Sequence, residues 1–152
     1  MTDSALPKEH DPLELENQLC FALYSATNVV KKAYRPLLDE LGLTYPQYLI
    51  LIVLWTSDGL KVSEIGQRLS LDSGTLTPVL KRLEASGFVS RTRRPQDERE
   101  VEIRLTSAGQ ELREKALAVR CEIVRQLDMS EHEIGVLRGE LNDVIASLNE
   151  HG

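Results

Sequence analysis

Two cysteines, Cys20 and Cys121, are the side chains in this sequence with the most reactive chemistry. A thiolate attacks peroxides and disulfides, provided that its surroundings lower the thiol pKa below the free value of about 8.5. By itself, Cys20 in an apolar helical pattern has a second interpretation, that of a small buried hydrophobic residue. The residue type therefore allows a redox site without requiring one.

Metal chemistry has little support in the sequence. The three histidines, His10, His132 and His151, are far apart, and neither cysteine belongs to a Cys-x-x-Cys pair. Structural zinc sites draw their ligands from closely spaced pairs of Cys and His. We therefore predict no metal site and no cofactor.

Composition indicates one globular domain. The 152 residues are 41% hydrophobic and 28% charged, which excludes collagen-like and disordered chains. The longest apolar run, Tyr48 to Trp55, is far shorter than the ~20 residues that span a bilayer. Two cysteines exclude a secreted disulfide scaffold, and the polar segment from Met1 to Ser4 lacks the order of a signal peptide. We expect a cytoplasmic protein without a membrane-spanning helix.

Positive charge is concentrated in one segment of an acidic chain. The net charge is −6, yet the stretch from Ser73 to Arg94 contains five basic residues and one acid. Such an island indicates a single surface that meets phosphate. A solvated basic patch is the alternative.

Amphipathic helices are predicted on both sides of this island. The first begins at Asp11–Pro12 and is kinked or ended by Pro36, and Thr44 opens a second, largely apolar helix. Thr106 caps another long helix, and a capping box at Ser130 opens the last. The apolar stripes of the outer helices exceed what one domain covers, which predicts a homodimer.

Two short helices in the middle of the chain resemble a helix-turn-helix, with Ser63 expected to cap the first and Asp72 the second. The second helix has small hydrogen-bonding residues near its start and cations further along, which suits a helix in a DNA major groove. A purely structural helix pair is the alternative. The residues expected to face DNA are Ser73, Thr75, Thr77, Pro78, Lys81 and Arg82.

A β-hairpin is predicted directly after this helix. Residues 88–93 and 101–105 alternate apolar and polar side chains, as half-buried strands do, and residues 94–100 form the turn. A hairpin in this place is a wing, whose basic residues reach a minor groove or phosphates. We expect Arg93, Arg94 and Arg99 to do so, and Asp97 to brace Arg99.

This order of elements resembles the MarR family of winged-helix repressors. Asp97-Glu98-Arg99 and Leu105-Thr106-x-x-Gly109 match the signature of that family. Three further segments resemble its organic hydroperoxide resistance regulator branch. They are Leu19-Cys20-Phe21-Ala22-Leu23-Tyr24, Leu43-Thr44-Tyr45-Pro46-Gln47-Tyr48 and Leu71-Asp72-Ser73-Gly74-Thr75-Leu76-Thr77-Pro78.

The resemblance implies a mainly α fold with a small β wing, in which dimerisation helices flank a winged helix-turn-helix. The expected regions are a flexible tail at 1–10, N-terminal dimerisation helices at 11–43, the DNA-binding domain at 44–106 and C-terminal dimerisation helices at 107–152.

The resemblance also implies a role for each candidate redox residue. The reactive cysteine of the branch corresponds to Cys20, its tyrosine partners to Tyr34 and Tyr45, and a second cysteine of some members to Cys121. Tyr34 follows Cys20 by fourteen residues, about 21 Å along one continuous helix. We therefore predict a site between subunits, in which Cys20 of one chain faces both tyrosines of the other. Interface packing of the tyrosines is the alternative.

The implied function is a repressor that binds a pseudo-palindromic operator as a reduced dimer and leaves it when organic hydroperoxide oxidises Cys20, through a disulfide with Cys121 or a small thiol. One alternative is a repressor released by a phenolic ligand without redox chemistry. A thiol peroxidase is another, although no Thr/Ser-x-x-Cys helix start surrounds Cys20. A DNA-bending protein would not need the cysteine and tyrosine set. We therefore expect a regulator and not an enzyme.

Overall fold

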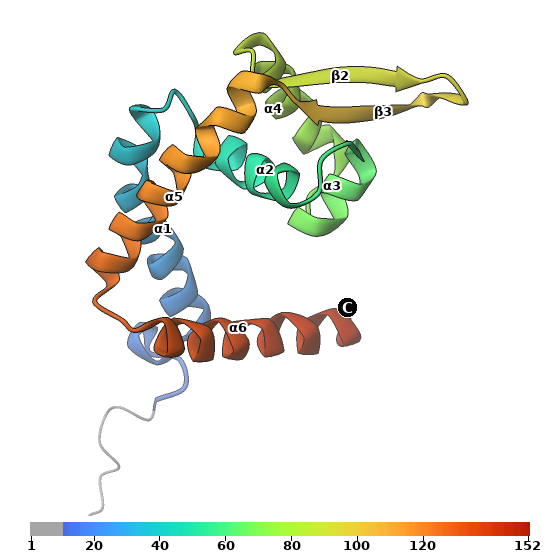
Figure 1. The fold of residues 1–152 in the computed structure, drawn as a ribbon. Helices are drawn as coiled ribbons and strands as arrows, with labels where there is room; N and C mark the ends of the chain where they lie inside the picture. The colour runs from blue at the N-terminus through green and yellow to red at the C-terminus, as the bar shows by residue number, and fades with distance from the viewer. Residues whose placement is uncertain (1–10) are drawn as a thin grey trace, which may run out of the picture. The chain divides into compact units, whose positions relative to one another are not determined.

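The computed structural model describes residues 11–152, apart from the side chains of residues 97–99. The elements follow one another as η2 (Leu15–Asn17), α1 (Leu19–Asp39), α2 (Tyr45–Thr56), β1 (Leu60–Lys61), α3 (Val62–Leu69), α4 (Ser73–Ala85), β2 (Val89–Arg94), β3 (Asp97–Leu105), α5 (Ser107–Leu127) and α6 (Glu131–His151) (Figure 1). The predicted fold, mainly α with a small β wing, is confirmed. The chain forms two compact units, Met1–Lys115 and Ala116–Gly152.

The first unit is built around α2, α3, α4 and a three-stranded antiparallel sheet in the order β1-β3-β2. The strands β2 and β3 extend as a hairpin beyond the helices (Figure 1). Leucine and isoleucine side chains fill the core and are almost completely inaccessible to solvent. The most deeply buried of them are Leu51, Ile65, Leu80, Leu83 and Ile103.

Local hydrogen bonds start α2 where the sequence predicts. The Oγ1 atom of Thr44 accepts the backbone N–H of Gln47, and the Gln47 side chain accepts the N–H of Thr44 in return. This capping box satisfies two donors that the first helical turn leaves without partners. Gly42, just before it, has a φ of +71°, which a residue with a side chain rarely adopts.

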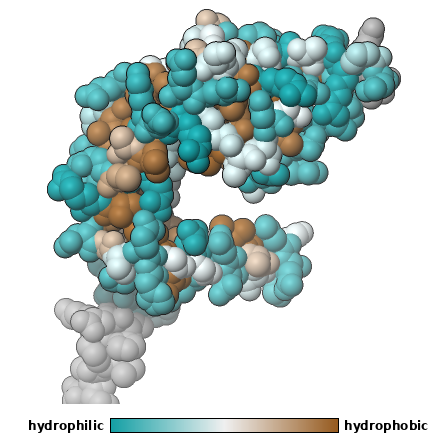
Figure 2. Space-filling view, viewed as in Figure 1, coloured by the Kyte–Doolittle hydropathy of each residue, from teal (hydrophilic) through white to brown (hydrophobic). Residues whose placement is uncertain are grey.

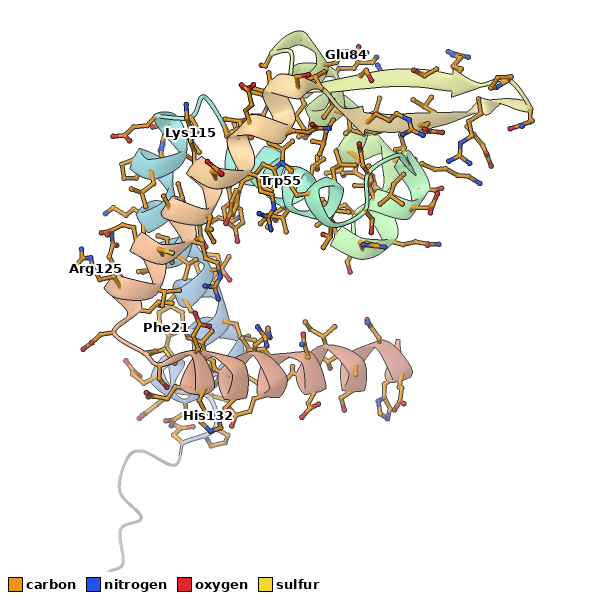
Figure 3. All side chains as sticks on the ribbon, viewed as in Figure 1. Phe21, Trp55, Glu84, Lys115, Arg125 and His132 are labelled. Carbon is orange, nitrogen blue, oxygen red and sulfur yellow. The ribbon has the colours of Figure 1, made fainter. Side chains whose placement is uncertain are left out.

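The far end of α2 is joined to the base of the wing. The indole Nε1 of Trp55 donates to the carbonyl oxygen of Gly109 at 2.9 Å, and Asp58 Oδ1 accepts the N–H of Leu105 at 2.9 Å. Trp55 lies on α2 below the start of α5 (Figure 3). Gly109 lies so close to Phe88 that an added Cβ would be 2.1 Å from the Phe88 carbonyl oxygen. The end of α2 is therefore hydrogen-bonded to the start of α5, and the residues that follow α2 are hydrogen-bonded to the end of β3.

The predicted start of the first helix is wrong. The continuous α-helix begins at Leu19, not at Asp11–Pro12, and a short 3-10 turn precedes it. Gln18 is in an extended conformation, and its side-chain amide donates to the carbonyl oxygens of Pro12 and Glu14. These bonds satisfy carbonyls that a helix would otherwise use. Pro36 does not end the helix, which continues to Asp39.

Two smaller boundaries also differ from the prediction. The helix expected to be capped by Ser63 begins at Val62, and the Glu64 carboxylate accepts the N–H of Lys61. The strand expected at 101–105 begins at Asp97, which pairs with Arg94. The turn of the wing is therefore shorter than residues 94–100.

The second unit consists of the later part of α5 together with α6. Asp128 adopts a φ of +52° between the two helices, and Ser130 Oγ accepts the N–H of Glu133 at 3.0 Å. The guanidinium of Arg120 pairs with both carboxylate oxygens of Glu131, at 3.0 and 3.1 Å. The capping box predicted at Ser130 is confirmed.

Candidate functional site

The start of α4 is defined by one carboxylate. Asp72 Oδ1 accepts the backbone N–H of Thr75 at 2.7 Å, and this hydrogen bond lowers the pKa of Asp72 below its usual value. The helix then has two faces. Leu76, Leu80 and Leu83 are buried in the core. The outward residues are the ones expected to face DNA.

Most of the predicted DNA-facing residues of α4 are exposed in the structure. Thr77 is half-buried, and its hydroxyl donates to the carbonyl oxygen of Ser73 at 2.7 Å. The exposed residues are Ser73, Thr75, Pro78, Lys81 and Arg82. The polar face of the helix thus ends in two cations, an arrangement that suits contact with a polyanion.

Pro78 lies inside α4 and changes its hydrogen bonding. Because proline has no N–H, it donates no helical hydrogen bond to the carbonyl of Gly74. That carbonyl belongs to the first turn of α4, beside exposed Ser73 and Thr75. The carbonyl of Gly74 therefore lacks the hydrogen bond that residue 78 of a regular helix would donate.

The turn between α3 and α4 requires a small residue at position 66. A Cβ on Gly66 would lie 2.5 Å from the carbonyl oxygen of Leu71, and the Leu71 N–H donates to the Gly66 carbonyl at 2.9 Å. Ser70, between them, has a φ of +56°. This close contact sets the angle at which α4 leaves α3, as a helix-turn-helix requires.

The wing contains acidic partners for its basic residues. Arg94 Nε lies 3.0 Å from a carboxylate oxygen of Glu102, and its Nη1 lies 3.6 Å from Glu100. Glu100 also pairs with Lys61 of β1 at 2.8 Å. At the other end of the hairpin, Arg91 contacts Glu84, which is labelled in Figure 3.

These ion pairs give the basic stretch at residues 73–94 acidic neighbours from β3. The basic stretch from Ser73 to Arg94 has one acid in the sequence, but strand pairing places Glu100 and Glu102 of β3 beside Arg94. Arg93 is exposed on the same hairpin. The side chains of Asp97 and Arg99, for which a bracing contact and a DNA contact are predicted, lie outside the described residues.

Cys20 is exposed near the start of α1 in the single chain. Within the single chain it is therefore not a buried hydrophobic residue. Tyr24 follows by four residues on the same helix, a spacing that places two side chains on one helical face. Tyr24 is not among the residues predicted for the redox site, although this spacing is visible in the sequence.

Tyr34 and Tyr45 are brought together, and a third tyrosine joins them. The ring centroids of Tyr34 and Tyr45 are 5.4 Å apart, those of Tyr34 and Tyr48 are 5.4 Å apart, and those of Tyr45 and Tyr48 are 6.3 Å apart. Burial, and secondarily the neighbouring Tyr34, raise the pKa of Tyr45. We call these three residues the tyrosine cluster. Tyr48 is not among the predicted site residues, although its spacing of three from Tyr45 on one helix could have indicated it.

Cys20 and Tyr34 belong to the same continuous helix, α1. At 1.5 Å per residue, the fourteen residues between them correspond to about 21 Å. The tyrosine cluster therefore cannot contact Cys20 of its own chain. A site in which Cys20 meets Tyr34 and Tyr45 therefore requires a second chain. That site stays a prediction.

Cys121 is exposed on α5. The next residue, Glu122, accepts hydrogen bonds from Arg125 and Gln126, and these bonds lower the Glu122 pKa to about 2.

Among the described residues, no group of three or more His, Cys, Asp or Glu side chains could hold a metal ion. None of the helices within residues 11–152 is long and apolar enough to cross a membrane.

Large apolar side chains are exposed on the outer helices. Figure 2 shows such residues along the surface of α6. No residue of α6 is buried in the described chain. The exposed apolar residues of α1 and α6 include Leu19, Phe21, Tyr24, Val29, Val136, Leu137, Ile145 and Leu148.

Comparison with known proteins places this chain in a family. A family model described as transcriptional regulator SarA/Rot matches residues 32–116. The organic hydroperoxide resistance transcriptional regulator of Bacillus subtilis is 43% identical over 145 residues, which cover 95% of this chain and 99% of that protein.

Solved structures agree with the sequence comparison. The structure of reduced AbfR bound to DNA has a TM-score of 0.76 and 36% identity, covering 88% of this chain and 93% of that chain. The structure of disulfide-formed AbfR has a TM-score of 0.66 and 38% identity, covering 90% and 92%. The chain belongs to the MarR/SarA family of winged-helix transcriptional regulators and is not an enzyme.

Proposed function

We propose that this chain is a homodimeric repressor that binds a pseudo-palindromic operator when Cys20 is reduced, and leaves it when an organic hydroperoxide oxidises Cys20. The observation that carries the proposal is the exposure of Cys20 on α1, in a chain 43% identical to an organic hydroperoxide resistance regulator. The proposal has three parts: DNA contact, dimer formation and thiol oxidation.

DNA contact is assigned to α4 and the wing. The exposed hydroxyls of Ser73 and Thr75 suit hydrogen bonds to base edges, and the cations Lys81 and Arg82 suit phosphates or guanine. Arg93 and Arg99 would contact the adjacent groove. The similarity to reduced AbfR, whose structure contains DNA, supports this assignment.

Dimer formation is assigned to the exposed apolar residues of α1 and α6. Large apolar side chains exposed on a helix are typical of an interface between copies. A two-fold dimer would present two α4 helices to two half-sites about one DNA turn apart. It would also supply the second chain that Cys20 needs to meet Tyr34 and Tyr45.

Thiol oxidation begins at the Cys20 sulfur. The thiolate attacks one oxygen of the peroxide group, the O–O bond breaks, and the alkoxide takes a proton and leaves as the alcohol. Cys20 has then lost two electrons and is a sulfenic acid. Hydroxyl donors from Tyr34 and Tyr45 of the partner chain would stabilise the thiolate that starts the reaction.

Cys121 is proposed as the resolving residue. Its thiol attacks the sulfenic sulfur, a disulfide forms, and water leaves. Closing that bond brings two Cα atoms within ~7 Å, which would shift α1 against α5 and move the α4 helices out of register with the operator. A small cellular thiol would fill the same role if Cys121 did not.

The test is fluorescence anisotropy of the reduced protein on labelled DNA from upstream of its own gene, before and after one equivalent of cumene hydroperoxide. We expect tight binding that is lost on oxidation and restored by dithiothreitol. Cys20→Ser should bind with the same affinity and ignore the peroxide. Wild-type binding that persists after peroxide treatment would contradict the proposal and favour release by a phenolic ligand.

A further inference from the structure

The tyrosine cluster contains one member that differs from the other two. Tyr48 is buried, with 5% of its surface exposed, whereas Tyr34 and Tyr45 are half-buried. Its ring lies 5.4 Å from the ring of Tyr34 and 6.3 Å from that of Tyr45. Tyr48 is therefore the inner member, against which the two outer rings rest.

The three rings come from two helices. Tyr34 belongs to α1, while Tyr45 and Tyr48 lie one helical turn apart on α2. The Tyr34 and Tyr45 rings meet edge to face, with an interplanar angle of 62°, and Tyr48 is tilted by 41° and 43° to them. Such geometries are the favoured ones for aromatic pairs, so each ring restricts the orientation of the others.

We propose that Tyr48 is a positioning residue of the peroxide-sensing site, which holds the Tyr34 and Tyr45 rings so that their hydroxyls face Cys20 of the partner chain. The inference rests on the proposed function. Tyr48 itself does not need to touch the thiol. Without its ring, Tyr34 and Tyr45 would lose their common support, and the hydrogen bonds to the thiolate would weaken.

Both outer hydroxyls have to carry their protons to act as donors. Burial and the neighbouring Tyr34 raise the pKa of Tyr45, so Tyr45 is neutral and a donor at physiological pH. The support that Tyr48 provides therefore concerns geometry and leaves the charge of the donors unchanged.

The experiment measures the reactivity of Cys20 as a function of pH in the full-length protein. In a Cys121→Ser background Cys20 is the only thiol, and iodoacetamide alkylation reports its thiolate fraction. We expect Tyr48→Leu to raise the midpoint of the profile by about one pH unit, and to slow oxidation by cumene hydroperoxide about tenfold at neutral pH. Operator binding of the reduced protein should change less than about twofold.

Rescue and control variants separate positioning from general destabilisation. Tyr48→Phe restores the ring and should restore the midpoint. Ile50→Ala, two residues away and equally buried on α2, loosens the core outside the cluster and should leave the midpoint at the wild-type value. If Tyr48→Leu does not fold, Tyr48→Met, whose side chain adapts to irregular space, replaces it with the same expectation.

The outcomes distinguish this inference from the proposed function. If Tyr34→Phe and Tyr45→Phe raise the midpoint while Tyr48→Leu does not, the positioning role is refuted and the sensing site stands. An equal shift in Ile50→Ala would refute the positioning role as well. If none of the tyrosine variants moves the midpoint, the inference and the tyrosine part of the proposed site both fail.

Discussion

Tyr34 of α1 and Tyr45 of α2 meet edge to face, with ring centroids 5.4 Å apart and an interplanar angle of 62°. The contact joins the helix that carries Cys20 to the helix whose far end is hydrogen-bonded to the start of α5. A residue pair of the candidate redox site is therefore also part of the packing between α1 and α2 in the first unit.

This contact has a consequence for the dependence of stability on pH. The pKa of Tyr45 is raised by burial, and further by Tyr34. A raised pKa in the folded state favours folding at pH values below the unfolded pKa of about 10, and this contribution is lost as pH rises through the folded value. We expect urea unfolding at pH 8 and pH 10.5 to show a larger loss for wild type than for Tyr45→Phe. Equal losses would contradict the assignment.

Trp55→Phe tests the connection between α2 and the start of α5. The substitution removes the 2.9 Å hydrogen bond from the indole to the Gly109 carbonyl. We expect the free energy of unfolding to fall by about 1–2 kcal/mol, from the lost hydrogen bond and the smaller ring. Because Trp55 is the only tryptophan, unfolding should be followed by circular dichroism. An unchanged unfolding midpoint would show that the bond contributes nothing to stability.

Gly109→Ala tests the close approach of α5 to the strand β2. The added Cβ would lie 2.1 Å from the carbonyl oxygen of Phe88, which forces backbone to move. We expect a loss of about 1–3 kcal/mol in unfolding free energy, together with weaker operator binding. Gly139→Ala is the matched control, since a Cβ there meets nothing within 4 Å, and it should stabilise α6 by roughly 0.5–1 kcal/mol.

Arg82 and Arg94 should respond differently to alanine substitution. Arg82 is exposed on α4, whereas the Arg94 guanidinium is already paired with Glu100 and Glu102. If Arg82 contacts a phosphate, Arg82→Ala lowers the slope of log affinity against log salt by about 1. Arg94→Ala should lower it less. Anisotropy titrations at four salt concentrations measure both slopes, and a larger effect for Arg94 would reverse the assignment.

Cys121→Ser tests the resolving role of Cys121. Without a partner thiol, the sulfenic acid at Cys20 is open to a second peroxide, which gives a sulfinic acid that dithiothreitol does not reduce. With excess cumene hydroperoxide we expect intact-mass spectra to show two added oxygen atoms that dithiothreitol does not remove. A mass that returns to that of the reduced protein with dithiothreitol would instead indicate that another thiol protects Cys20.

Short-range hydrogen bonds made several features predictable from the sequence. The caps at Thr44, Asp72, Thr106 and Ser130 each join atoms three residues apart, and all four lie where their residue types predict. The wrong prediction for the start of α1 also has a local cause. Gln18 reaches back to Pro12 and Glu14, a competing local arrangement that an apolar periodicity does not reveal.

Contacts between distant segments were decided by the tertiary structure. Glu100 and Glu102 become partners of Arg94 only because β2 and β3 pair in one register, and Tyr48 joins Tyr34 only because α1 packs on α2. The sequence by itself determined the order of the helices, the polar face of α4 and the candidate residues Cys20, Tyr34 and Tyr45. The side-chain neighbours of those residues follow from packing between elements, which depends on the whole core and not on any local stretch of residues.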